Sequence, residues 1–250
     1  MTHTPLYLDW SFWTALVALL ALVLSQLPPL YALLKPARLE VEAYARMHVT
    51  HDLGSPIAQL HIVVTNMGGQ VAKIKSVSLN FNRRDGGTFE LAGFGYYQNP
   101  TDNMVVLMTP FRLRSKDDWG HIVHFFNPLP REEQREVAKI KSALRNNISS
   151  RKLVHEDQNN PIEAPPELVT PATDFFQRMF KWRPDDYDVM LNIQTEPAKH
   201  SVTRQYRMTI FESDTKQLED RTQRYKYGAG VYFPDSEAQM EPVFIPLVPA

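Results

Sequence analysis

The chain has 250 residues, of which 43% are hydrophobic and 22% are charged, a balance that fits one large globular domain or two small ones. It holds 27 Lys and Arg against 28 Asp and Glu, so it lacks the overall positive charge of a general nucleic-acid-binding protein, although this balance allows a local basic patch. There is no cysteine, which excludes disulfides, thiolate metal sites and cysteine nucleophiles.

A short tail, residues 1–9, precedes an apolar segment, residues 10–34, that has no charged side chain. A helix of that length is about 37 Å long, against a hydrocarbon core of about 30 Å, so the sequence predicts a single retained transmembrane helix. The alternatives are a cleaved signal peptide and a buried core helix. Residues 1–9 contain no Lys or Arg and no Ala-x-Ala site follows, which disfavours the signal peptide.

The flanks of this segment indicate its orientation in a bilayer. Tryptophans at one end and a tyrosine near the other resemble an aromatic belt, and two adjacent prolines would kink or end the helix. Positive residues follow the segment but do not precede it, which predicts a single-pass protein of the inner membrane with its soluble domain in the cytoplasm. The predicted anchor residues are Trp10, Trp13, Pro28, Pro29, Tyr31, Lys35 and Arg38.

Residues 35–233 are expected to form a mainly β domain. Apolar and polar residues alternate through Leu39–Thr50, as in a strand with one buried and one solvent-exposed face. Turn sequences at 52–56, 66–69 and 84–87 separate further alternating runs. The pattern predicts consecutive antiparallel strands joined by short turns.

Residues 128–181 interrupt the strand pattern and are expected to form a helical insertion. In REEQREVAKIKSALRNNI acidic residues lie near the N-terminus and basic residues further along, which matches the helix macrodipole. Its narrow apolar stripe is Val137, Ile140, Leu144 and Ile148. Residues 234–250 contain four prolines and are expected to be a C-terminal tail.

Two stretches resemble known β-sandwich domains. LHIVVTNMGGQVAKIKSVSLNF (60–81) resembles the start of bacterial immunoglobulin-like or fibronectin type III-like domains, with a strand, an Asn-x-Gly turn and a second long strand. WRPDDYDVMLNI (182–193) resembles their tyrosine-corner strand, with Tyr187 as the tyrosine. The resemblance covers 34 residues and implies an antiparallel immunoglobulin/fibronectin III-like sandwich. It implies nothing about activity.

Few residues carry a chemical signature. His48-x-x-His51 and His121-x-x-His124 are the ligand-like pairs, with His61 as a third candidate. Residues i and i+3 of a strand face opposite sides, so neither pair forms a metal clamp without a turn between its members. We interpret adjacent aspartates in turns as residues that cap or solvate the turn, and not as acid–base pairs. We therefore expect no catalytic, cofactor-binding or metal site.

The aromatic residues leave two interpretations open. Phe175, Phe176, Phe180 and Trp182 belong to the core or, if the helical insertion is exposed, form a candidate interaction surface. The predicted function is a membrane-anchored, non-enzymatic interaction, sensor or accessory subunit of a bacterial membrane complex. Its partners would be the lipid bilayer and a protein or second copy, with no nucleic acid and no cofactor. The alternatives are a membrane effector of an antiphage or stress system that oligomerises through its span, an envelope-assembly protein with a periplasmic domain, and an enzyme.

Overall fold

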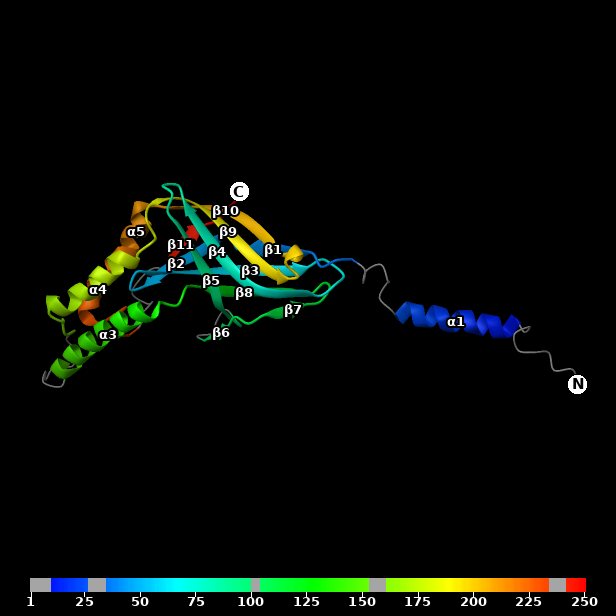
Figure 1. Cartoon of the computed structure of the whole chain (residues 1–250), viewed down its shortest axis with the longest axis horizontal. Coiled ribbons are helices and arrows are strands. Elements are labelled where there is room, and N and C mark those ends of the chain that lie inside the picture. The colour runs from blue at the N-terminus through cyan, green and yellow to red at the C-terminus, as the bar shows by residue number, and fades with distance from the viewer. Residues whose placement is uncertain (1–9, 27–34, 100–103, 153–160, 234–241) are drawn as a thin grey trace, which may run out of the picture.

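The structure is a computed structural model, and it describes residues 10–26, 35–99, 104–152, 161–233 and 242–250 (Figure 1). The described strands are β1 (Leu39–Ala43), β2 (Arg46–Asp52), β3 (Ser55–Asn66), β4 (Ala72–Arg83), β5 (Thr88–Tyr97), β6 (Val105–Leu107), β7 (Phe111–Leu113), β8 (Asp118–Phe125), β9 (Asp185–Glu196), β10 (Val202–Ile210), β11 (Val243–Pro246) and β12 (Val248–Pro249). The described helices are α1 (Trp10–Gln26), α3 (Arg131–Lys152), α4 (Pro166–Met179), α5 (Glu212–Glu219), and the 3-10 helices η2 (Ala198–His200) and η3 (Asp220–Tyr227).

All named strands pair antiparallel in one sheet, so the prediction of a mainly β antiparallel domain is confirmed. The order is β11-β2-β3-β8-β5-β4-β9-β10-β12, with β1 on β3, β6 on β5 and β7 on β4. The sheet curls until β10 approaches β1 and β11, and this nearly closes it. Residues that alternate along the strands line the interior; Leu60, Ile62 and Val64 of β3 are at most 1% exposed.

Strand β5 determines how the sheet curls. It pairs with β4 through Thr88–Ala92 and with β8 from Gly93 onward, and its register shifts between Gly93 and Gly95. A Cβ on Gly95 would lie 2.6 Å from the Val106 carbonyl oxygen, so only glycine allows β6 to pack this closely. Because β5 is hydrogen-bonded to both halves, they form one continuous antiparallel sheet, and this arrangement fits the predicted β-sandwich with β5 passing from one half to the other.

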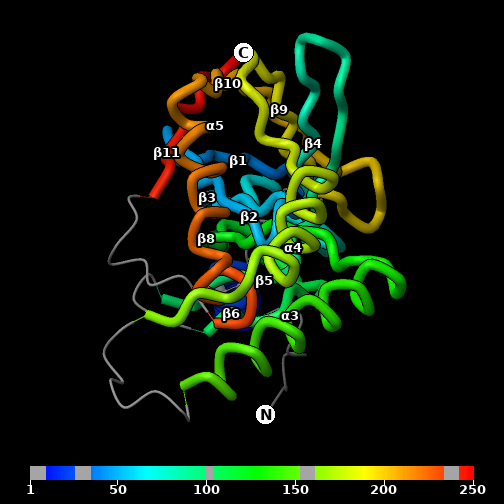
Figure 2. The backbone as a smooth tube through the Cα atoms, turned by 90° about the vertical axis from the view of Figure 1, so that its left-hand side faces the viewer, coloured from blue at the N-terminus to red at the C-terminus, as the bar shows by residue number. Residues whose placement is uncertain are grey.

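Helices cover one end of the sheet, which we call the distal end (Figures 1 and 2). Helices α3 and α4 lie between β8 and β9 in the chain and contact each other, and α4 also contacts η3. The buried residues of α3 are those of the predicted apolar stripe, Val137, Ile140, Leu144 and Ile148. The Tyr187 hydroxyl donates to the Arg183 carbonyl at 2.8 Å and accepts from the Arg183 N–H at 3.0 Å, the backbone contacts expected of a tyrosine corner.

The C-terminal residues from 243 to 249 are strands and not the predicted tail. β11 pairs with β2, and β12 pairs with β10. Val243, Ile245 and Leu247 are buried and alternate with exposed residues, so this short stretch contributes to the core. Its prolines lack the N–H that a central strand needs, so the sequence pattern predicts no strand here. For the same reason Pro246 and Pro249 lie on edge strands.

Helix α1 lies apart from the sheet (Figure 1). It has 17 residues and is about 25 Å long at 1.5 Å per residue, shorter than the bilayer core. Within the described ranges, no helix combines the length and apolar character needed to cross a membrane. The single span predicted over 10–34 is therefore unsupported, and residues 27–34 lie outside the described chain.

The chain joins the sheet at the end opposite to the helices, which we call the proximal end. The fully buried side chain of Asn66 holds the segments of the proximal end together. Asn66 Oδ1 accepts the N–H groups of Arg38 at 3.4 Å and Gly68 at 3.0 Å, and Nδ2 donates to the carbonyls of Gln70 at 2.8 Å and Leu113 at 3.1 Å. One side chain thus connects the incoming segment, the β3–β4 turn and β7.

Candidate functional site

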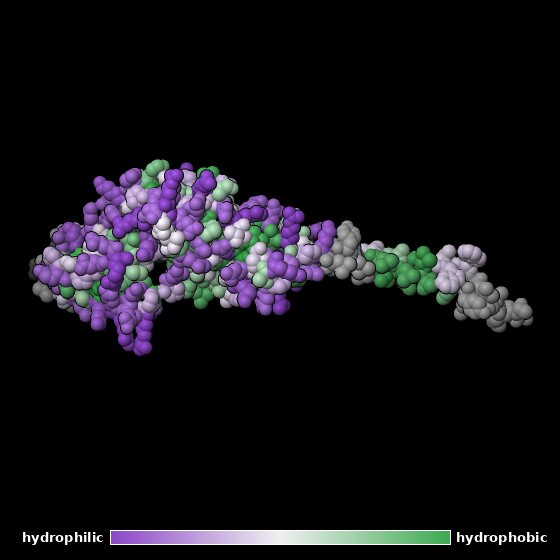
Figure 3. Space-filling view, turned by 45° about the horizontal axis from the view of Figure 1, so that its top comes forward, coloured by the Kyte–Doolittle hydropathy of each residue, from purple (hydrophilic) through white to green (hydrophobic). Residues whose placement is uncertain are grey.

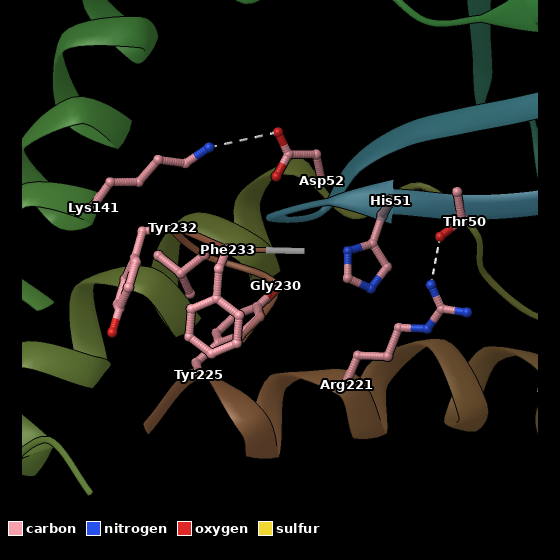
Figure 4. A pocket seen from close by; sticks show the side chains of 10 residues that line it. Thr50, His51, Asp52, Lys141, Arg221, Tyr225, Gly230, Tyr232 and Phe233 are labelled. Atoms are coloured by element: carbon pink, nitrogen blue, oxygen red, sulfur yellow. Dashed lines mark hydrogen bonds and ion pairs between the residues drawn. The ribbon is translucent and has the colours of Figure 1, made fainter. Parts of the chain in front are cut away.

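A pocket of about 380 Å³ opens at the distal end, where the end of β2 meets α3, η3 and residues 230–233 (Figure 4). The β2–β3 turn shapes it, because Gly54 has φ +88° and its position allows the backbone of Phe176 in α4 to lie directly against it. Any side chain there would overlap Phe176. The residues that line the pocket include Thr50, His51 and Asp52 from β2, Lys141 from α3, Arg221 and Tyr225 from η3, and Tyr232 and Phe233.

His51 is a structural residue of the pocket wall. Its Nε2 donates to the Leu218 carbonyl at 2.9 Å, and its Nδ1 accepts the Gly54 N–H at 3.2 Å. Burial lowers the pKa of His51 to about 4; the hydrogen bond to Leu218 opposes this, and the charge of Arg221 adds to it. The ring is therefore neutral at pH 7, and neither nitrogen has a lone pair left for a metal or a proton.

Two cationic side chains face the pocket from opposite sides (Figure 4). Arg221 Nη1 donates to the Thr50 hydroxyl. Lys141 Nζ lies 3.9 Å from Asp52 Oδ2, a partly exposed pair that contributes little stability. Among the lining residues described, no nucleophile stands beside a free base. The cationic and aromatic side chains of the lining suit the binding of an anionic or aromatic group.

The four aromatic residues of the candidate interaction surface are buried. Phe175 and Trp182 are 0% exposed, and Phe176 and Phe180 are 4% exposed, so they are core residues and not a surface. The reason is that the apolar face of α4 packs on the sheet end. Trp182 Nε1 donates to the Thr50 carbonyl at 2.7 Å. The rings of Phe176 and Phe180 lie 5.0 and 5.8 Å from His51. These residues support the pocket from behind.

The predicted anchor residues are divided between regions. Trp10 and Trp13 of α1 are 84% and 48% exposed. Lys35 and Arg38 are exposed at the proximal end, and their carbonyls accept hydrogen bonds from the β3–β4 turn. The remaining three predicted anchor residues, Pro28, Pro29 and Tyr31, lie outside the described chain.

The histidine pairs are not brought into a metal site. His48 Nδ1 contacts Gln59 Oε1 at 3.3 Å, and His121 Nδ1 contacts the Tyr97 carbonyl at 3.1 Å. Burial, and then the nearby charge of His48, lower the pKa of His124. In the part of the chain that the structure describes, no three His, Cys, Asp or Glu side chains lie together as a metal site would require.

Sequence reasoning did not find the pocket. Thr50 and Arg221 are 171 positions apart, and Lys141 comes from a third element, so no local spacing marks them as neighbours. The one available signal was the run of aromatic and glycine residues at 225–233, which includes Tyr225, Gly230 and Tyr232.

Comparisons with protein-family models, with curated proteins and with solved structures each found no match. The function is therefore inferred from the geometry of this chain alone.

Proposed function

We propose that this protein is a membrane-attached, non-enzymatic interaction subunit. In this proposal α1 attaches it to the lipid bilayer and the β domain presents its distal pocket to a protein partner or a second copy. The single observation that carries the proposal is the surface of α1.

Helix α1 has no charged residue and no polar face. Side chains on every side of it are exposed, among them Val17 at 62%, Leu20 at 52% and Leu22 at 61%. Figure 3 shows the resulting apolar band, in contrast to the mostly polar surface of the β domain on that face. A continuous apolar surface of this kind is rarely left in water, and an acyl-chain environment can cover all sides of a helix at once.

The charges that follow the apolar segment support attachment to the cytoplasmic face of the inner membrane. Lys35 and Arg38 are the first basic residues of the chain, and residues 1–9 have none. In this proposal the apolar segment that begins with α1 inserts into the bilayer, and positive residues that flank an inserted segment are retained on the cytoplasmic side. The twelve residues of β3 separate the proximal end from the pocket by about 36 Å, so a partner at the pocket would stand clear of the lipid.

Vesicle flotation of the full chain tests the attachment. We expect the wild-type chain to float with lipid vesicles and Leu20→Arg to remain in the dense fraction, because a charge at the middle of α1 opposes insertion. Val248→Arg is the matched control, since Val248 is equally apolar and 59% exposed but lies on β12. Equal flotation of Leu20→Arg and Val248→Arg would refute the role of α1.

A C-terminal alkaline phosphatase fusion tests the side of the membrane. We expect no phosphatase activity in cells, since the enzyme requires the periplasm. An active fusion would contradict the cytoplasmic assignment and support the envelope-assembly alternative.

A further inference from the structure

The proximal end carries an excess of positive charge. The segments 35–38, 66–75, 112–118 and 196–200 contain eight Lys and Arg and three Asp and Glu, a formal net charge of +5. The whole chain has a net charge of −1, so the remaining residues sum to −6. The surface formed by these segments is therefore much more positive than the chain as a whole.

These four segments form one contiguous surface. Lys35 accepts N–H groups of the 66–71 turn through its carbonyl, and Ser115 Oγ donates to the Gly68 carbonyl at 2.7 Å. Lys73 of β4 stands opposite Arg112 of β7 on one side and Glu196 of β9 on the other. The Asn66 side chain joins the first three segments by hydrogen bonds, and the pairing of β4 with β9 places the fourth beside them.

Most of the cations on this surface are solvent-exposed. Arg112, Arg114 and Lys116 are exposed on β7 and on the turn that follows it. Lys73 forms an ion pair with Glu196, and the Asp117 carboxylate accepts the Arg114 backbone N–H at 3.0 Å. The Arg114 side chain is itself exposed. With eight cations against three carboxylates, these segments form a positive patch.

Two apolar side chains project from the same surface. Met67 and Val71, on the β3–β4 turn, are 59% and 53% exposed. They flank glycines that pack against the incoming chain, and a Cβ on Gly68 would overlap the backbone at Pro36. The turn is therefore held firmly, and it presents apolar side chains in the middle of a positive surface.

We propose that the proximal end is a docking surface for anionic lipid headgroups. The exposed Lys and Arg side chains contact headgroup phosphates, and Met67 and Val71 enter the interfacial region. This inference rests on the proposed function, because α1 brings the membrane to this end of the domain. Docking would set the β domain upright, with the pocket directed away from the lipid.

The observations favour lipid over nucleic acid as the anionic partner. The chain coming from α1 joins the β domain at Lys35, within the positive patch itself, so a bilayer that holds α1 faces this patch. Exposed apolar residues at the centre suit an interfacial region, whereas phosphate backbones are bound by cations and polar groups.

Site-specific fluorescence on the full chain tests the docking, and the absence of cysteine makes single-site labelling unambiguous. The Met67→Cys variant is labelled with an environment-sensitive dye. It is then mixed with vesicles of phosphatidylcholine alone or of phosphatidylcholine with added phosphatidylglycerol. We expect the dye emission to shift to shorter wavelength, and quenching by lipid-borne bromine to appear, only with the anionic lipid. Thr88→Cys, on the exposed start of β5 at the opposite end of β4, should respond to neither.

Charge variants complete the test. The triple variant Arg112→Gln, Arg114→Gln, Lys116→Gln should abolish the shift at position 67, and the matched triple Arg131→Gln, Arg135→Gln, Lys139→Gln on α3 should retain it. Raised salt should weaken the shift.

The outcomes separate the two proposals. A chain that floats with both vesicle types but shows the same emission at position 67 in each overturns the docking surface alone. A chain that floats with neither overturns both proposals. A dye response to an added oligonucleotide, but not to anionic lipid, assigns the surface to nucleic acid and also overturns the docking proposal.

Discussion

Helix α1 and strand β3 contain the same types of apolar residue in opposite environments. Leu19, Leu20 and Leu22 of α1 are 52–61% exposed, whereas Leu60 and Ile62 of β3 are at most 1% exposed. A strand alternates its faces, so one apolar face packs on the core while the other remains wet. Helix α1 is apolar all round, and a domain with a closed core could cover only one of its sides. Hydrophobicity alone therefore does not identify the residues that stabilise this fold.

The largest expected effect concerns the core beneath the pocket. Trp182→Ala should lower the free energy of unfolding by about 3–5 kcal/mol, because a large buried side chain is replaced by a cavity. It also removes the hydrogen bond to the Thr50 carbonyl and the contacts with Phe81 and Phe89, whose ring centres lie 5.3 Å away. Chemical denaturation in detergent measures this loss of unfolding free energy. Trp182→Phe keeps most of the ring volume and should be affected less; a loss under about 1 kcal/mol for the alanine variant would contradict a closed core.

The proximal end should be nearly as sensitive to one polar substitution. Asn66→Ala removes four hydrogen bonds and leaves backbone groups of Arg38, Gly68, Gln70 and Leu113 with fewer partners, so we expect a loss of about 3 kcal/mol. The same denaturation experiment applies.

Asn80→Ala is the matched control for Asn66. The Asn80 Oδ1 has no hydrogen-bond partner in the described structure, so its removal should change stability by less than about 1 kcal/mol. Equal effects of the two substitutions would show that Asn66 does not organise the proximal end.

The distal end should be sensitive to acid. Burial lowers the pKa of His51 from 6.5 to about 4, so the unfolded chain takes up a proton as the pH falls below 6.5 while the folded chain does not. Stability therefore falls with pH in this window, by about 2 kcal/mol between pH 7 and pH 5 from this group.

The comparison of variants isolates the contribution of His51. His51→Gln should show a shallower loss of unfolding free energy between pH 7 and pH 5 than wild type, while the exposed His61→Gln should follow wild type. Parallel curves for all three proteins would show that His51 titrates normally.

The smallest effect on stability is expected in α1. Leu20→Ala should change the free energy of unfolding of the β domain by no more than about 0.5 kcal/mol, because Leu20 is exposed and packs on no part of the described domain. The matched Leu60→Ala should lower it by about 2–5 kcal/mol. A comparable loss in both would mean that α1 packs on the domain, and the contrast between the two regions would not hold.

Local patterns in the sequence predicted much of the secondary structure. Alternation marked the early strands, and the stripe Val137, Ile140, Leu144 and Ile148 marked the buried face of α3. Both signals are local, since the 2.0 and 3.6 periods follow from the backbone of a single element. The tail predicted over 234–250 shows the limit of this reasoning, because prolines obscured an alternation of which Val243 and Ile245 form the buried face.

The candidate sites could not be read from local patterns. The cluster from Phe175 to Trp182 has the same sequence whether it is exposed or buried, and the packing of α4 on the β2–β3 turn decided that it is core. The pocket required Thr50, Lys141 and Arg221 to meet from three elements.

By itself, the sequence determined the apolar character of 10–26, the mainly β character of the domain, the helical insertion and the absence of thiol chemistry, because each depends on residue type and short-range period. Only the tertiary structure decided that β5 joins both halves into one curled sheet, that the four aromatics from Phe175 to Trp182 are core and not a surface, and that cations from four separate segments meet at the proximal end. These features depend on which strands pair, and pairing is a long-range choice made by the packing of the whole chain.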